Sequence, residues 1–231
     1  MNGESGGNEM IDVVTIDGPA GAGKSTVART VARGLGFTFL DTGAMYRAVA
    51  LGAVEAGIGV SDTNALTRYL AELDLVIVPN PEVMELRVNG RDVTRAIRRP
   101  EMGQYASDYS TLPAVREFCS RRQREFGGRG RVVCEGRDMG TVVFPDARWK
   151  FFLTASVAER ARRRWAELRD GGEDPDRVEI KRAIRERDRQ DSERALAPLK
   201  PAGDAVIIDT TELSLDEVVA QVIGRVRPRQ S

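Results

Sequence analysis

The chain has 231 residues, of which 41% are hydrophobic and 30% charged, a composition typical of soluble globular proteins. Thirty-five basic residues balance 35 acidic ones, and this zero net charge disfavours a general nucleic-acid or membrane-surface binder. Histidine is absent, which excludes histidine-activated nucleophiles and histidine-ligated metals. Cys119 and Cys134 show no metal-ligand spacing, so we expect buried, reduced thiols in a cytoplasmic protein.

Five short apolar runs alternate with helical patterns along the chain. Near-continuous apolar residues predict strands buried on both faces at 12–16, 37–40, 131–135, 149–153 and 205–209. Helical patterns lie between them at 24–35, 43–56, 63–72, 113–126, 157–169, 176–194 and 214–226. Ser156 and Glu159 have capping-box spacing, and Asp174-Pro175 fits a helix N-cap followed by proline. This alternation predicts an α/β fold with a parallel sheet.

Other segments interrupt this pattern or lie at its ends. Residues 73–94 contain Asn89-Gly90, a strong hairpin signal, which predicts a small antiparallel excursion of two or three strands. Residues 170–176 read as a mobile loop between two charged helices. The polar residues 1–10 do not resemble a signal peptide, and both they and 227–231 are expected to be disordered tails. No run reaches the roughly 18 apolar residues of a membrane span, so we expect no membrane partner.

Residues 18–25 read GPAGAGKS, which matches the G-x-x-x-x-G-K-[ST] phosphate-binding loop, or P-loop. Glycines allow successive backbone N–H groups to surround phosphate oxygens, and the helix that follows adds its positive end. Lys24 would carry charge to the β- and γ-phosphates, and the Ser25 hydroxyl would ligate Mg²⁺. The motif lies between a predicted strand and a predicted helix, which is the context it requires. The sequence therefore predicts a nucleoside-triphosphate site.

Three further polar clusters lie near the ends of predicted strands or on one helix. The segment LDTGAMYRA, residues 40–48, follows the second strand, where open parallel sheets bind ligands. Arg137 and Asp138 follow the strand 131–135 on the same sheet edge as the P-loop. Arg187, Asp191 and Arg194 share one stripe of a helix. For the last two clusters, a solvated charged surface is the common alternative.

With these clusters in view, the chain resembles the bacterial cytidylate kinases, a branch of the nucleoside-monophosphate kinases. The motifs TIDGPAGAGKST, DTGAMYR, EGRDMGTVVFPDA and APLKPAGDAVIIDT occur in that family's order, and the resemblance covers about residues 11–226. It implies a P-loop NTPase-type core with a five-stranded parallel sheet, a small antiparallel β insertion and a mobile lid. The core would comprise 11–66 and 111–226, the monophosphate-binding insertion 67–110 and the lid loop 165–178.

The resemblance also implies an activity and a set of site residues. A monomer would transfer the γ-phosphoryl group of ATP, with Mg²⁺, to CMP or dCMP. The residues expected to bind ATP are Gly18, Pro19, Ala20, Gly21, Ala22, Gly23, Lys24, Ser25 and Thr26 of the P-loop, with Arg160 and Arg164 of the lid. The acceptor phosphate would meet Thr42, Tyr46, Arg47, Arg137 and Arg187; the cytosine edge Ser107, Arg116 and Asp138; and the sugar Asp191, supported by Arg194. Lys24, Arg137 and Arg187 would be catalytic.

The chemistry of such a transfer agrees with an arginine-rich site that has no histidine. A monophosphate has a second pKa of about 6, so the nucleophile is already an anion at neutral pH and needs no general base. Arginine binds phosphate bidentately and stays charged. In the adenylate-kinase branch an aspartate near the second strand holds Mg²⁺-bound waters, but here Ala44 stands at that position. Asp41 and Glu135 are both candidates to replace it, and the sequence does not choose between them.

Two alternatives remain at this point. One is a P-loop kinase for another acceptor, such as UMP. The other is a nucleotide-dependent switch or binding module; a guanine-type switch would carry an Asn-Lys-x-Asp segment, and none of the five asparagines is followed by lysine.

Overall fold

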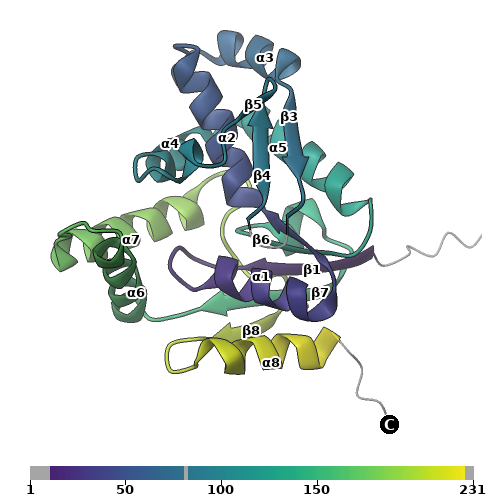
Figure 1. The fold of residues 1–231 in the computed structure, drawn as a ribbon, viewed down its shortest axis with the longest axis vertical. Coiled ribbons are helices and arrows are strands. Elements are labelled where there is room, and N and C mark those ends of the chain that lie inside the picture. Colours follow the sequence, from purple (N-terminus) through teal and green to yellow (C-terminus); the bar gives the residue numbers. More distant parts are fainter. Residues whose placement is uncertain (1–10, 81–82, 227–231) are drawn as a thin grey trace, which may run out of the picture.

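The computed structural model describes residues 11–80 and 83–226 and centres on a five-stranded sheet (Figure 1). Its strand order is β2-β6-β1-β7-β8, and every neighbouring pair is parallel. The strands are β1 (Ile11–Asp17), β2 (Thr38–Asp41), β6 (Val132–Gly136), β7 (Ala147–Thr154) and β8 (Val206–Asp209). Because all five run the same way, their carboxyl ends meet at one edge of the sheet, where such folds bind ligands.

Helices cover both faces of this sheet. Helices α1 and α8 pack against one face, where they share a hydrophobic cluster with β1, β6 and β7, while α2 and α5 belong to the larger cluster on the other (Figure 1). Helix α3 packs against α5, and α4 against α2. The helices are α1 (Lys24–Leu35), α2 (Thr42–Glu55), α3 (Thr63–Glu72), α4 (Met102–Tyr109), α5 (Pro113–Gly127), α6 (Val157–Asp170), α7 (Arg177–Glu193) and α8 (Leu215–Val226).

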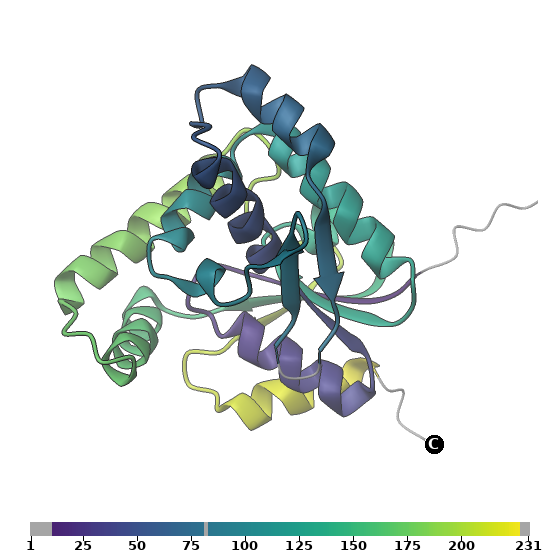
Figure 2. The same cartoon turned by 45° about the horizontal axis from the view of Figure 1, so that its top comes forward.

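A second, three-stranded sheet lies beside α2 (Figure 2). It has the antiparallel order β3-β4-β5, formed by β3 (Leu75–Val78), β4 (Glu85–Val88) and β5 (Arg91–Asp92). Asn89 and Gly90 form the turn with φ of 50° and 78°, the two positive values that a two-residue hairpin requires. Leu86 and Val88 pack into the cluster that contains α2. The expected antiparallel excursion and its turn are confirmed.

Helices α6 and α7 form a hairpin that projects to one side of the sheet (Figures 1 and 2). A small cluster of its own, Ala161, Ile180 and Ile184, holds the two helices together, and Trp165 packs against it. Two guanidinium groups flank the Trp165 ring, with Arg177 at 3.9 Å and Arg169 at 5.1 Å from its centroid. Cation–π contacts of this kind stabilise the connection between the helices.

The structure confirms the five predicted parallel strands and the seven predicted helices, with ends that differ by at most two residues. Four features differ from expectation. Helix α4, a short 3-10 helix at Ala96–Arg98 and a π-helical turn at Met139–Val143 were not predicted. The N-cap of α7 is Asp176, whose side chain accepts the Val178 N–H, so the assignment to Asp174-Pro175 was wrong.

Other sequence expectations have separate outcomes. Cys119 and Cys134 are buried free thiols, as predicted. Among the described residues, no helix combines the length and apolar character needed to cross a membrane. The expected tails, 1–10 and 227–231, lie outside the described residues.

Candidate active site

The P-loop connects the end of β1 to the start of α1, as its motif requires. Gly18 has φ of 146°, and a Cβ there would lie 2.0 Å from the Leu153 carbonyl oxygen of β7. Gly21 has φ of 77°, and its Cβ would lie 3.0 Å from Cβ of Arg160. Both positions therefore need glycine, because the loop is folded tightly between the sheet and α6.

Lys24 is buried at the first turn of α1, where its Nζ donates a 2.7 Å hydrogen bond to the Pro19 carbonyl. Burial lowers the pKa of Lys24 well below its ordinary value, and the positive charges of Arg137 and Arg187 act in the same direction. A phosphate group would supply the opposite charge. The helix also begins without an acidic residue in its first turn, so its positive end is available to an anion.

Ser25 and Glu135 meet beside the P-loop. The Ser25 hydroxyl donates to the Glu135 carboxylate at 2.7 Å, and the Thr42 hydroxyl donates to the Glu135 backbone carbonyl at 2.6 Å. Glu135 is 6% exposed, and burial raises its pKa. Asp41, the other candidate for the Mg²⁺ site, instead caps α2 by accepting the Ala44 N–H at 2.7 Å and pairs with Arg47 at 3.2 Å.

This donor set fits Mg²⁺, which prefers oxygen ligands and keeps several waters. No group of three or more histidine, cysteine or acidic side chains gathers in the described ranges, so the protein offers no complete metal cage there. The Ser25 hydroxyl and the Glu135 carboxylate can hold a magnesium ion that arrives with nucleotide phosphates.

Charged side chains from α5, from the residues that follow β6 and from the end of α7 form a largely buried network. Arg137 donates through Nε to Asp191 at 2.8 Å, and Arg116 pairs with Asp138. Arg194 lies between the two acids, 3.7 Å from Asp138 and 3.8 Å from Asp191. Although burial opposes it, the charge and hydrogen bond of Arg137 lower the pKa of Asp191. The residues that follow β6 are therefore joined to the end of α7.

Several buried polar atoms near this network lack a hydrogen-bond partner within the described part of the chain. They are the Tyr46 hydroxyl, Nε of Arg47, Nε of Arg187 and one Nη of Arg194. Burial lowers the pKa of Arg187 to about 10, and the charges of Arg137 and Arg47 add to this effect. Buried donors without partners are costly, and clustered cations repel one another, so this region suits an anionic, polar ligand.

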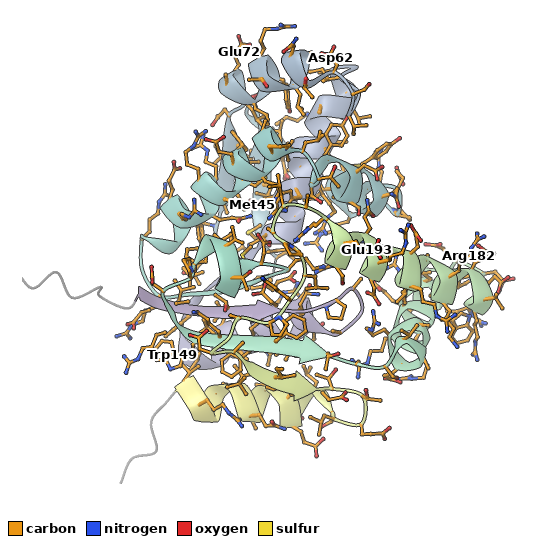
Figure 3. The ribbon with its side chains drawn as sticks, turned by 180° about the vertical axis from the view of Figure 1, so that it is seen from behind. Met45, Asp62, Glu72, Trp149, Arg182 and Glu193 are labelled. Atoms are coloured by element: carbon orange, nitrogen blue, oxygen red, sulfur yellow. The ribbon has the colours of Figure 1, made fainter. Side chains whose placement is uncertain are left out.

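The structure brings Ser107 close to the same network from α4. Its hydroxyl donates a 2.8 Å hydrogen bond to Oε1 of Gln190 on α7. A cavity of about 770 Å³ lies between α4, the start of α5 and α7, and its lining includes Gln104, Arg187, Gln190 and Arg194. Figure 3 shows the end of α7, marked by Glu193, beside α2, where Met45 is labelled.

The two arginines predicted to face ATP have different surroundings. Arg160 is 4% exposed and forks onto Asp188 with bonds of 2.9 and 2.7 Å, while also donating to the Ala20 carbonyl at 3.1 Å. It thus ties α6 and α7 to the P-loop. Arg164 is 40% exposed and pairs with Glu167 at 2.8 Å.

Sequence reasoning did not select two side chains near the P-loop. Arg163 donates to the Thr210 carbonyl at 2.6 Å and approaches Gly23. Asp17, 4% exposed, accepts the N–H groups of Met139 and Gly140 at 2.9 and 2.8 Å. Its place directly before the P-loop, at the end of a buried strand, was the available signal. Burial raises the pKa of Asp17 to about 7.

Comparison with known proteins gives a consistent result. The cytidylate kinase family model matches residues 14–228. The cytidylate kinase of Carboxydothermus hydrogenoformans is 47% identical over 215 residues, covering 92% of this chain and 97% of that protein. The cytidylate kinase of Pseudomonas putida is 46% identical over 224 residues, covering 96% and 98%. An uncharacterized protein of known structure from Eubacterium ventriosum shares the fold, with a TM-score of 0.50, 12% identity and coverage of 94% and 98%. The chain belongs to the cytidylate kinase family.

Proposed function

We propose that the protein is a (d)CMP kinase that transfers the γ-phosphoryl group of ATP to CMP or dCMP, giving ADP and CDP or dCDP. The observation that carries this proposal is a cluster of partly buried arginines, Arg47, Arg187 and Arg194, near the P-loop. Each has a buried nitrogen that finds no hydrogen-bond partner among the residues the structure describes. Such a cluster can hold two phosphorylated ligands facing each other. Family membership and the cytidylate kinase names of the relatives support cytidine as the acceptor base.

In the proposed reaction, an oxygen of the acceptor phosphate forms a bond to the γ-phosphorus of ATP. The bond from that phosphorus to the bridging oxygen breaks, and ADP leaves. Lys24, Arg137 and Arg187 stabilise the charge on the transferred group, and the chain supplies no general base because the acceptor is already ionised. Ser25, with support from Glu135, would hold Mg²⁺, which would supply positive charge against the phosphate oxygens of ATP.

The remaining predicted residues take roles at the two nucleotides. Residues 18–26 surround the phosphates of ATP, and Arg164 faces ATP from the lid. Arg160 keeps its place against Ala20 and so positions the P-loop. Thr42, Tyr46 and Arg47 line the acceptor phosphate, Ser107, Arg116 and Asp138 face the base, and Asp191 with Arg194 holds the sugar.

Two segments would move during the cycle. The insertion at 67–110 carries Ser107. The proposed lid at 165–178 comprises the end of α6, the connection at 171–176 and the first residues of α7. Their closure over the core would exclude water that could otherwise hydrolyse ATP. We propose that the protein acts this way as a cytoplasmic monomer, without nucleic-acid or membrane partners.

A coupled assay of ADP release tests the proposal, with Mg²⁺-ATP and each of CMP, dCMP, UMP, AMP and GMP. We expect turnover with CMP and dCMP well above the other acceptors. Better turnover with UMP would favour a kinase for another monophosphate. Binding of ATP without turnover of any acceptor would favour a switch or binding module.

A further inference from the structure

The contact between Ser107 and Gln190 joins two elements that are far apart in the sequence. Ser107 lies on α4 and is 6% exposed, while Gln190 lies on α7 between Arg187 and Arg194. The hydroxyl of Ser107 donates to Oε1 of Gln190 at 2.8 Å across 83 residues of sequence. Gln190 also lines the cavity between α4 and α7. The Gln190 amide therefore fixes the orientation of the Ser107 hydroxyl beside this cavity.

A serine hydroxyl has one hydrogen and two acceptor lone pairs. When its hydrogen is given to Gln190, Ser107 can only accept a hydrogen bond from a ligand. Amino groups can supply that hydrogen, whereas carbonyl oxygens cannot and would instead meet a lone pair. Without this bond the Ser107 hydroxyl could bind either a donor or an acceptor of the ligand. With the bond it can bind only a hydrogen-bond donor.

We propose that Gln190 is a specificity-determining positioning residue, which fixes Ser107 as an acceptor and so favours a pyrimidine with a 4-amino group over one with a 4-oxo group. The inference rests on the proposed function, in which Ser107 faces the base of the acceptor nucleotide. Cytosine donates from its 4-amino group, and uracil presents a carbonyl at the same position. Discrimination arises from a gained hydrogen bond with cytosine and from lone-pair repulsion with uracil.

Two substitutions separate hydrogen-bond acceptance from shape. Gln190→Met keeps a long unbranched side chain but cannot accept the Ser107 hydrogen, so that hydroxyl becomes free to donate to uracil. We expect the ratio of kcat/KM for CMP to that for UMP to fall about tenfold, the value of roughly one hydrogen bond. Gln190→Glu still accepts the hydrogen, and we expect it to retain most of the wild-type ratio.

Gln104→Met is the matched control, because Gln104 lines the same cavity from α4 but its amide donates to Asp108, whereas Gln190 accepts from Ser107. This variant should leave the CMP-to-UMP ratio unchanged. In a Ser107→Ala background the effect of Gln190→Met on the ratio should vanish, because the hydroxyl that Gln190 orients is gone.

The outcomes distinguish this inference from the proposed function. A wild-type protein that does not prefer CMP to UMP would overturn the proposed acceptor and with it the role of Gln190. A wild type that prefers CMP, with an unchanged ratio in Gln190→Met, would overturn the inference alone, even if both activities fell. An equal loss of the ratio in Gln190→Glu would also overturn it, because a carboxylate oxygen can still accept the Ser107 hydrogen and acceptance would then not explain the preference.

Discussion

The Ser25 hydroxyl donates a 2.7 Å hydrogen bond to the carboxylate of Glu135, although 110 residues separate the two in the sequence. Asp41 lies beside Glu135 in the register of β2 and β6 but is occupied with the N–H of Ala44 and with Arg47. This contact distinguishes two acids that the sequence alone left equal. It makes Glu135 the better candidate to support Mg²⁺ beside Ser25.

Glu135→Gln should raise the Mg²⁺ concentration needed for half-maximal activity about tenfold, because the amide removes a negative charge that favours the ion. A magnesium titration at saturating CMP measures this. Asp41→Asn is the comparison variant, and its main effect should be on the KM for CMP through Arg47. A larger shift in magnesium dependence for Asp41→Asn than for Glu135→Gln would show that Asp41, and not Glu135, supports the metal.

Arg187→Ala should lower kcat by about 100-fold. The buried Nε of Arg187 has no hydrogen-bond partner within 11–80 and 83–226, so it can meet charge on the transferred phosphoryl group. The affinity for Mg²⁺-ATP should change much less. Steady-state kinetics and calorimetric titration with ATP measure the two effects separately. Arg189→Ala, two residues along the helix, removes an exposed arginine that pairs with Glu186 and Glu193 and should leave kcat unchanged. Normal turnover in Arg187→Ala would remove it from the catalytic group.

Asp191→Ala should impair both CMP and dCMP, because it removes the proposed sugar contact and releases Arg137 from its 2.8 Å bond. Breaking this buried pair should also lower the free energy of unfolding by about 3 kcal/mol. Kinetics with each substrate and urea denaturation measure these effects. Glu193→Ala, an exposed acid near the end of the same helix, should change the stability by less than about 0.5 kcal/mol. If Asp191→Ala has the same kinetics as the wild type with both substrates, Asp191 does not contact the sugar.

The raised pKa of Asp17 predicts that the stability of the protein depends on pH. Burial raises its pKa from an ordinary 3.8 to about 7, so the folded protein binds the proton more tightly than the unfolded chain does. The contribution of Asp17 is therefore fully present below pH 4 and is lost as the pH rises toward about 7. Relative to that of Asp17→Asn, the free energy of unfolding of the wild type should fall by up to about 4 kcal/mol over this range. Denaturation of both proteins from pH 4 to 8 measures the difference, and a constant difference would contradict the shifted pKa.

The sequence predicted the main sheet and most helices because their patterns are local. Helix α4 was missed because its eight residues, which include Gly103 and Ser107, have a weak helical signal, and its position depends on packing against α2. The α7 cap was misplaced because Asp174 and Asp176 both precede the helix, and only geometry shows that the side chain of Asp176 reaches Val178.

The sequence indicates which residues belong to the candidate site, but it does not indicate which of them contact one another. The P-loop and the arginines carry recognisable motifs, whereas the bond between Arg160 and Asp188 joins two helices across 28 residues and has no local signature. Charged residues on a helix can face a ligand or brace a neighbour, and pattern alone does not separate the two. The same limit applied to Gln190, whose partner lies 83 residues away.

The two tryptophans lie in different parts of the fold, so their fluorescence can report on each part separately. Trp149 lies on β7 of the central sheet (Figure 3), and Trp165 lies on α6 with its ring between Arg169 and Arg177. The emission of an indole responds to nearby charge, so a Trp149→Phe protein would have a single fluorophore in the α6–α7 hairpin. If ATP changes the position of that hairpin, as the proposed lid closure requires, the protein's own fluorescence would record the change in real time and without an attached dye.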